Sequence, residues 1–223
     1  MAFPANIYGN VRQGTRRSYT SGGNQLIDMN LGGEALMNQC LPERSELVRL
    51  GYSFSAQMPA ASAWTLLITI PTTLANLSLQ NGEASNGKSY IIDRFWIKAV
   101  TSMASACSLC PLSQLVPPGT ALVADDATVL RMSLSGKTGP AARTLAQIVM
   151  ASTATGCLTD KWNHHASAQQ GATTNIATLI EVQCYGRYIV PPKGSFNINA
   201  QESVSGGTAI AGVEWHEAQL DLG

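Results

Sequence analysis

Two of the five cysteines have a spacing that is typical of metal or redox chemistry. Cys107 and Cys110 form one Cys-x-x-Cys motif, whereas Cys40, Cys157 and Cys184 stand alone. A structural zinc ion takes four ligands, commonly from two such motifs, and a redox motif belongs beside a strand–helix–strand unit that this region does not predict. We therefore interpret the pair as small apolar residues in or beside a strand, and we expect no metal ion and no other cofactor. The odd number of cysteines implies no disulfide framework and favours folding in a reducing cytoplasm.

The histidines are the next residues that could carry chemistry. His164 and His165 are adjacent, in a polar stretch that also contains Asp160. These side chains could form a metal site, although two neighbouring histidines rarely chelate one ion by themselves. His216 precedes Glu217, but adjacent residues on a strand point to opposite faces, so they do not form a natural acid–base pair. We interpret all three histidines as surface or interface residues.

No catalytic motif stands out in the chain. It contains no GxSxG elbow, no HExxH, no Walker loop, and no GxGxxG after a predicted strand. No nucleophile or pair of acids is singled out either. We expect a protein that is not an enzyme, and a hydrolase built on a β-sandwich is the weakest of three hypotheses.

Four tryptophans raise the question of a sugar-binding platform, because sugars stack on aromatic rings. Trp64 and Trp215 fall in alternating segments and are predicted to be core residues, while Trp96 is assigned to neither group. Trp162 lies in a long polar loop, residues 156–173, and is expected to be exposed. A loop of this length is often a functional or contact element. The candidate ligand-binding residues are Trp162, His164 and His165.

Alternation of apolar and polar residues predicts β-strands through most of the chain after Gly51. Turn signals such as Asn81-Gly82 and Asn86-Gly87 separate these segments. One segment is expected to place Ile91, Phe95 and Ile97 on one face, with Arg94 and Lys98 on the other. Another is expected to place Leu130, Met132 and Leu134 on one face. The predicted strands are residues 64–70, 90–100, 128–134, 145–150, 176–190, 195–200 and 208–220.

Seven or eight strands without strand–helix alternation or internal repeats predict an all-β fold, an antiparallel β-sandwich. The long strands and loops favour a jelly roll as its specific form. Residues 51–223 are predicted to form this domain. Residues 1–50 are predicted to form an extended N-terminal arm with a short helix over 42–50, because Pro42 suits a first helical position and Gly51 a C-terminal cap.

The arm is expected to lie along another surface and contribute to assembly. Arg12, Arg16 and Arg17 occur before the first acidic residue, Asp28, and the apolar residues of the arm argue against a fully disordered tail. We also expect no secretory signal, since the first residues have no apolar stretch. The candidate assembly residues of the arm are Arg12, Arg16, Arg17, Leu26 and Leu31.

Composition favours a protein that is buried in an assembly. Charged residues make up 13% of the chain, and the net charge is zero. A neutral polar surface costs little to bury, because few charges must be desolvated. A chain without basic excess is not expected to bind nucleic acid directly, since phosphate contacts supply most of that affinity. No apolar run is long enough to span a membrane.

The C-terminal part of the chain resembles a known class of proteins. The stretch YGRYIVPPKGSFNINAQ, followed by a Gly-rich turn and AGVEWHEAQLDL, resembles the last hairpins of jelly-roll virion proteins of tailed bacteriophages. The resemblance covers residues 176–220. It implies a capsid decoration or cement protein, or a head-vertex, neck or tail-attached protein. It also implies a homotrimer located in the virion, with the major capsid protein as a partner. The alternative is a glycan- or receptor-binding module of a phage particle.

Overall fold

The computed structural model describes residues 43–69, 73–101, 107–115, 122–126, 128–135, 144–150, 156–164, 166–168, 179–202 and 206–220. The chain divides into two compact units, residues 1–43 and 44–223, and the description below concerns the second. The predicted arm residues Arg12, Arg16, Arg17, Leu26 and Leu31 lie outside the described residues.

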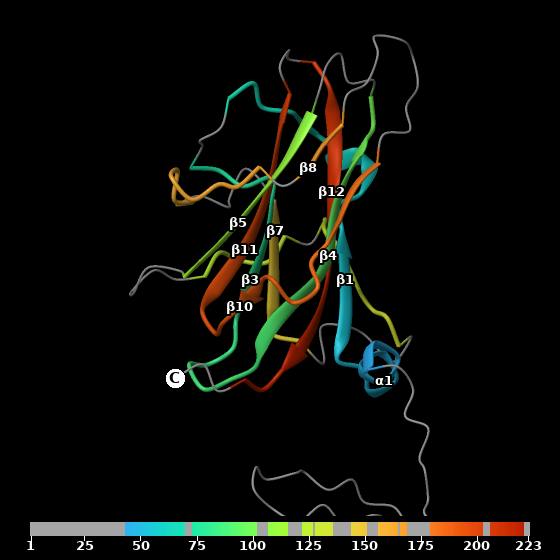
Figure 1. Ribbon diagram of the computed structural model, residues 1–223, viewed down its shortest axis with the longest axis vertical. Coiled ribbons are helices and arrows are strands. Elements are labelled where there is room, and N and C mark those ends of the chain that lie inside the picture. Colours follow the sequence, from blue (N-terminus) through green and yellow to red (C-terminus); the bar gives the residue numbers. More distant parts are fainter. Residues whose placement is uncertain are drawn as a thin grey trace, which may run out of the picture. The chain divides into compact units, whose positions relative to one another are not determined.

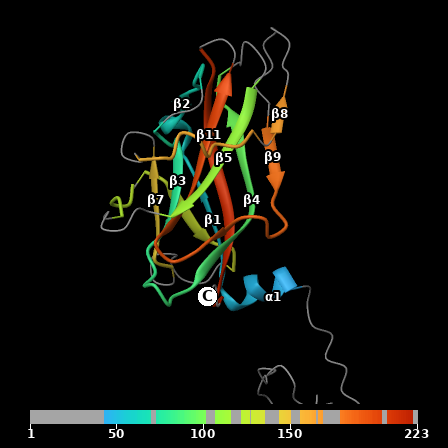
Figure 2. The same ribbon diagram turned by 60° about the vertical axis from the view of Figure 1, so that its left-hand side comes forward.

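Two antiparallel sheets pack face to face, so the predicted β-sandwich is confirmed (Figures 1 and 2). The seven-stranded sheet contains β1 (Ser53–Gln57), β2 (Trp64–Thr65), β4 (Ser89–Ala99), β6 (Leu130–Ser133), β9 (Leu179–Gln183), β10 (Ile189–Val190) and β12 (Thr208–Ala218). The five-stranded sheet contains β3 (Leu77–Asn81), β5 (Cys107–Leu115), β7 (Ala146–Met150), β8 (Ala166–Ala168) and β11 (Gly194–Glu202). The helices are α1 (Glu43–Leu50) and the short 3-10 helix η1 (Ala60–Ser62).

The strand order is that of a jelly roll, as predicted. The strands β1, β12, β4 and β9 are neighbours in this order in one sheet, and β3, β11, β5 and β8 are neighbours in the other. Along the chain these eight strands switch between the sheets at most steps, as the two interlocked Greek keys of a jelly roll require. The inserted strands β6 and β7 extend the two sheets beyond β1 and β3.

The core lies between the sheets and is built from the inward side chains of both. Phe54 stacks on Trp215 with ring centroids 5.7 Å apart, and Phe95 meets Phe196 edge to face at 5.2 Å. Trp215 is fully buried and Trp64 is 8% exposed, which confirms both as core residues. Buried aromatic rings of this size supply much of the apolar area that drives folding.

A β-bulge in β4 corrects one predicted face. The register of β4 with β12 shifts at this point, so that Trp215 lies opposite Ile92 and Glu214 lies opposite Arg94. An extra residue reverses the alternation on either side of it. Ile92 therefore lies in the core, and Ile91, which was expected beside Phe95, is on the outer face.

Two predicted strands are shorter than expected. The segment 64–70 pairs as β2 only at Trp64–Thr65, and Ile68 is 52% exposed. The segment 176–190 is interrupted by a turn after Cys184, which separates β9 from β10, and both strands pair with β4. The predicted loop 156–173 contains a strand, β8, which pairs with β5 and ends the five-stranded sheet.

Helix α1 confirms the short helix that was predicted at the end of the arm. It ends at Leu50, and Gly51 with φ of 82° follows, which is a conformation that favours glycine. The N–H of Gly51 donates to the carbonyl of Val48 at 2.9 Å, and Tyr52 donates to Leu47 at 2.9 Å. These bonds lead the chain directly into β1.

Candidate functional site

The first part of the loop that was predicted to bind a ligand, residues 156–164, packs on the outer face of the five-stranded sheet. Trp162 is half-buried rather than exposed, which corrects the expectation from sequence. Its ring packs against a small apolar cluster, separate from the main core, with Val123 beside it. The buried members of this cluster are Ala75, Leu112, Val149 and Cys157. Trp162 therefore belongs to a second, smaller core.

Backbone and side-chain contacts hold this covering loop, residues 156–164, along β5. The N–H of Asn163 donates to the carbonyl of Pro111 at 3.1 Å. The amide of Gln114 accepts from the N–H of Leu158 at 2.9 Å and donates to the carbonyl of Gly156 at 3.3 Å. Because the contacts run along the loop on both sides of Trp162, the loop shields β5 from solvent.

The predicted histidine pair is placed only in part. His164 Nδ1 lies 3.4 Å from Cys110 Sγ, while His165 lies outside the described residues. Asp160 forms an ion pair with Lys161 at 3.3 Å. In the described ranges there is no group of three or more His, Cys, Asp or Glu side chains that could hold a metal ion.

The described cysteines are buried free thiols. Cys107 faces the main core, whereas Cys110 lies on the outer side of β5, so the motif does not converge on one point. Burial raises the pKa of both thiols to about 12. Burial also raises the pKa of Cys157 to about 11 and of Cys184 to about 12. Such thiols are protonated near neutral pH and are poor nucleophiles.

A second segment covers the same sheet beside this loop. The N–H of Val123, in residues 122–126, donates to the side-chain oxygen of Gln80 at 2.9 Å. The neighbouring polar side chains of β3 and β11 are also buried, and Asn199 bonds Asn76 and the carbonyl of Leu74. Buried amides of this kind are stable only when they are hydrogen-bonded. The outer face of the five-stranded sheet thus carries buried amides beside the small apolar cluster, and segments of the chain itself cover it.

The outer face of the seven-stranded sheet differs, because apolar side chains remain exposed on it. At one edge, β6 pairs with β1 so that Met132 lies opposite Ser55, on the side away from the core. Leu130 is 58% exposed, Met132 59% and Leu134, which follows the strand, 40%. We call these three residues the edge ridge. The predicted grouping on one face was right, but this face points to solvent.

Arg131 explains why β6 is turned this way. Its side chain points inward between the sheets, forms an ion pair with Asp125 at 2.6 Å and donates a hydrogen bond to the carbonyl of Ala146 in β7. Asp125 also accepts from the N–H of Ile148 at 2.8 Å. Arg131 therefore closes the sandwich between its two inserted edge strands, and its neighbours in β6 must face outward.

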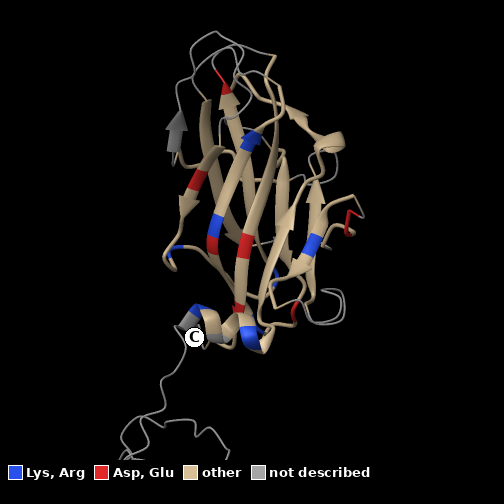
Figure 3. Cartoon of the chain, turned by 90° about the vertical axis from the view of Figure 1, so that its right-hand side faces the viewer, with Lys and Arg blue, Asp and Glu red and all other residues tan. Residues whose placement is uncertain are grey.

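The centre of the same face carries an arginine paired with two carboxylates. Arg94 contacts Glu214 at 2.5 Å and Glu181 at 3.3 Å, and its guanidinium lies 5.4 Å from the ring centre of Trp96. Figure 3 shows blue and red segments side by side on these strands. The indole of Trp96 lies directly over Gly212, where any Cβ would overlap it. The arginine is thus paired within its own chain, and the cluster as a whole carries one excess negative charge.

Nearer to helix α1, Asp93 connects the sheet to the helix. Its carboxylate accepts from His216 Nδ1 at 3.1 Å and from Arg44 at 3.0 Å. Partial burial alone would raise the pKa of Asp93, but the hydrogen bonds and charges of His216 and Arg44 lower it below its ordinary value. The bulge is what turns both Asp93 and Arg94 outward.

His216 and Glu217 point to opposite sides of β12, as predicted. Glu217 is 3% exposed and accepts hydrogen bonds from Lys88 at 3.0 Å and from Thr144. It thus fastens the chain before β7 to the seven-stranded sheet. The sequence did not predict the Asp93–His216–Arg44 and Arg94–Glu181–Glu214 clusters, because their members are distant along the chain. The one local signal was Gly212, since a glycine within an apolar strand marks a place where another group approaches the backbone closely.

Comparisons with known proteins give one weak similarity. No protein-family model matches the sequence, and no curated protein matches it. Among solved structures, the chain is similar to a chain in the structure of a marine algae virus of the order Picornavirales, with 9% sequence identity and a TM-score of 0.27 over 100% of this chain and 92% of that one. At this TM-score the similarity does not establish a common fold, so the assignment of the jelly roll rests on the strand order. None of the helices among the described residues has the length and apolar character needed to cross a membrane.

Proposed function

We propose that the protein is a structural component of a virus particle that associates with copies of itself through the outer face of the seven-stranded sheet. The observation that carries the proposal is a jelly roll, a fold used by viral capsid domains, whose seven-stranded outer face leaves large apolar side chains uncovered. An edge strand with exposed apolar residues is a site for association with another chain.

The charge pattern supports the same proposal. Charged residues are 13% of the chain, and the arginine at the centre of this face, Arg94, is already paired with Glu181 and Glu214. Burying such a surface requires little desolvation of free charge. Many weak contacts between copies then add up through multivalency.

The finer form of the proposal follows the resemblance of residues 176–220. It is a capsid decoration or cement protein of a bacteriophage, a homotrimer that folds in the host cytoplasm and binds the major capsid protein in the virion. Its N-terminal arm, with Arg12, Arg16 and Arg17, adds contacts to a neighbour. The proposal includes no catalytic step, no cofactor, and no direct contact with nucleic acid or a membrane.

Multi-angle light scattering after size exclusion, over a range of concentrations, tests self-association. We expect an oligomer from the intact chain and a smaller species from the double variant Leu130→Ser, Met132→Ser. The matched control is Leu158→Ser, which removes an apolar side chain of similar exposure, 46%, from the covering loop. A control that dissociates as much as the double variant, or an intact chain that is monomeric at all concentrations, contradicts the proposal.

A second function, glycan or receptor binding, is favoured by Trp96. Jelly rolls also include lectin domains, and Trp96 lies flat over Gly212 beside Glu181 and Glu214, which can accept hydrogen bonds from sugar hydroxyls. Under this alternative, Trp96→Ala abolishes binding on a glycan array while the thermal unfolding midpoint stays close to that of the intact chain. An array without signal for the intact chain eliminates it.

A further inference from the structure

The turn that interrupts the strand between β9 and β10 has an unusual residue in it. The N–H of Arg187 donates to the carbonyl of Cys184 at 3.0 Å, which closes a four-residue turn. Both central residues have positive φ, 49° for Tyr185 and 76° for Gly186, as in a type I′ turn. Glycine, asparagine and aspartate suit these positions, whereas a bulky aromatic residue there is strained.

Among the described residues, no hydrogen bond, ion pair or ring contact of the Tyr185 side chain offsets this strain. Its side chain is 85% exposed, the largest exposed fraction among the described large apolar residues. An asparagine would fit the same turn without the steric cost of an aromatic residue. A strained conformation that persists without a local benefit points to a role outside the folded domain.

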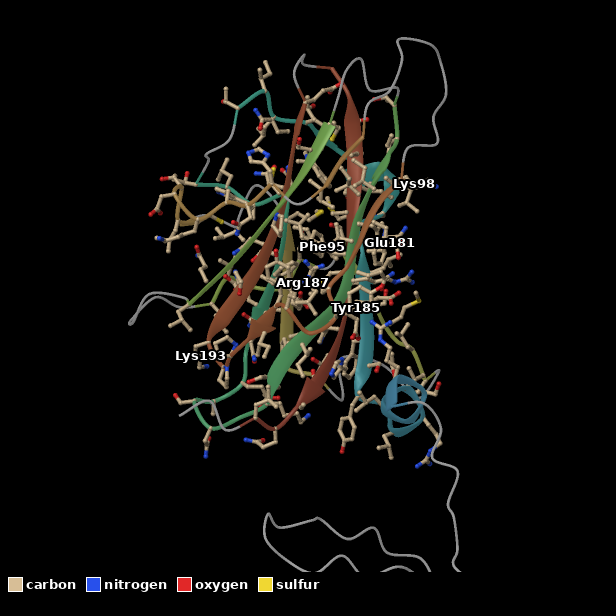
Figure 4. All side chains as sticks on the ribbon, viewed as in Figure 1. Phe95, Lys98, Glu181, Tyr185, Arg187 and Lys193 are labelled. Carbon is tan, nitrogen blue, oxygen red and sulfur yellow. The ribbon has the colours of Figure 1, made fainter. Side chains whose placement is uncertain are left out.

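The turn is also rigid, which suits a contact residue. Arg187 donates a second hydrogen bond to the carbonyl of Cys184 from Nε at 3.2 Å, and one to the carbonyl of Gln183 at 3.1 Å. Cys184 is fully buried, and its N–H donates to the carbonyl of Asp93 at 2.8 Å. Figure 4 shows Tyr185 and Arg187 on this turn. A tyrosine has only two side-chain torsions, so on a backbone held in this way it loses little conformational entropy on binding, and tyrosine is a common anchor of interfaces.

The edge ridge of Leu130, Met132 and Leu134 lies at the other edge of the same sheet. In the strand order β6 stands at one end, and β10 and β9 stand beside β4 at the other. The charges at the two edges are complementary. Arg187 gives the turn a positive charge, whereas Asp126 precedes the ridge, and its side chain bonds Thr128 without an ion pair to any described residue.

We propose that copies of this chain join head to tail, with the Tyr185 turn of one copy packed on the edge ridge of the next. This inference rests on the proposed self-association and specifies its geometry. Because the two surfaces differ and lie at opposite edges, the contact is heterologous, and it closes into a ring when the rotation between copies permits. Tyr185 fills the space over Met132 and shields the exposed edge strand β6.

The variant Tyr185→Asn tests the anchor, because fold stability and association should change in opposite directions. We expect its thermal unfolding midpoint to be equal to or higher than that of the intact chain, and its association, measured by sedimentation velocity, to be weaker by about tenfold or more. The matched control is Lys193→Asn. Lys193 also has positive φ, 65°, but it lies on another turn, between β10 and β11 (Figure 4). This control should relieve similar strain and leave association unchanged.

Mixing two variants tests the head-to-tail geometry. Tyr185→Asn keeps an intact ridge, and Met132→Ser keeps an intact turn, so each alone should be mostly monomeric. A mixture should form a one-to-one heterodimer and nothing larger, which native mass spectrometry resolves. A mixture that stays monomeric, or a Tyr185→Asn variant that assembles like the intact chain, overturns the head-to-tail contact. If the head-to-tail contact fails but Met132→Ser is still monomeric, the proposed self-association through the edge ridge survives. If the intact chain is itself monomeric, both the self-association and the head-to-tail contact are overturned.

Discussion

The outer faces of the two sheets of the sandwich differ in how far the chain itself covers them. On the five-stranded sheet the chain returns over its own strand β5, and Trp162 seals a small second core around Leu112. On the seven-stranded sheet Leu130 and Met132 are more than half exposed at the edge strand β6. Both faces are built from the same kind of alternating strand, yet one is covered by the chain itself and the other is left open.

This difference separates the side chains that stabilise the fold from those that are free to take part in the proposed association. Side chains on the covered face contribute to folding, because their burial is complete within one chain. Side chains on the open face contribute little to the fold and gain burial only when another surface meets them. Substitutions on the two faces should therefore have separable effects, one on unfolding and the other on assembly.

The largest expected effect contrasts one buried residue with one exposed residue. Leu112 is fully buried under the covering loop, whereas Met132 is 59% exposed. Leu112→Ala should lower the free energy of unfolding by about 2–5 kcal/mol, and Met132→Ala should change it by less than about 0.5 kcal/mol. Urea unfolding of monomeric protein at low concentration measures both. Equal losses would show that the two faces do not differ in this way.

Removing the tryptophan of the covering loop should have the next largest effect. Trp162 is half-buried against the second core, so Trp162→Ala should cost about 2 kcal/mol, roughly half of what a fully buried tryptophan costs. The same urea experiment measures it, with Lys161→Ala as a neighbouring exposed control. A variant as stable as the intact chain would return Trp162 to the role of an exposed ligand-binding residue.

Thiol labelling should distinguish the covered face from the main core, because the cysteines of the two regions should become accessible at different urea concentrations. Cys110 lies under the covering loop and Cys157 is part of it, whereas Cys107 and Cys184 belong to the main core. A pKa near 12 leaves far less thiolate than an ordinary thiol has, so labelling requires opening.

In rising urea concentration, Cys110 and Cys157 should react first, because a loop opens locally at a lower free energy than the core. Mass spectrometry after pulse labelling measures the order, in a Cys40→Ser background. Simultaneous reaction of all four thiols would mean that the covering loop opens only with global unfolding.

On the open face, we expect the contribution of Asp93 to the free energy of unfolding to be small and to depend on pH. The pKa of Asp93 is lowered in the folded state by His216 and Arg44. A carboxyl with a lowered folded pKa stabilises the protein at pH values above its unfolded pKa, and this contribution is lost as pH falls through the folded pKa. We expect Asp93→Asn to remove no more than about 1 kcal/mol at pH 6 and progressively less as the pH falls. Unfolding midpoints in urea at pH 3 and pH 6 measure the difference, and an equal loss at both would contradict it.

Local alternation was enough to predict most strands and the sandwich. Phe196 and Ile198 in β11, and Val213 and Trp215 in β12, lie in the core as their period-two spacing predicted. The bulge in β4 was not predictable, because one extra residue leaves no mark in composition yet reverses the face of Ile91.

The candidate site depended on contacts that no local pattern contains. Trp162 was expected to be exposed because its neighbours are polar, but the position of β5 beneath the loop decides its burial. Conversely, the apolar face of β6 points to solvent because Arg131, with its partner Asp125, occupies the inward side. Both outcomes depend on pairings between distant segments of the chain.

Hydrogen–deuterium exchange at low and high protein concentration tests the central claim most directly. We predict that association slows exchange in residues 130–134 and 179–190, on the seven-stranded sheet, and leaves residues 156–164 unchanged. This pattern would place the contact between copies on the open face. Slower exchange confined to residues 156–164, or no change anywhere while the mass increases, would contradict the account.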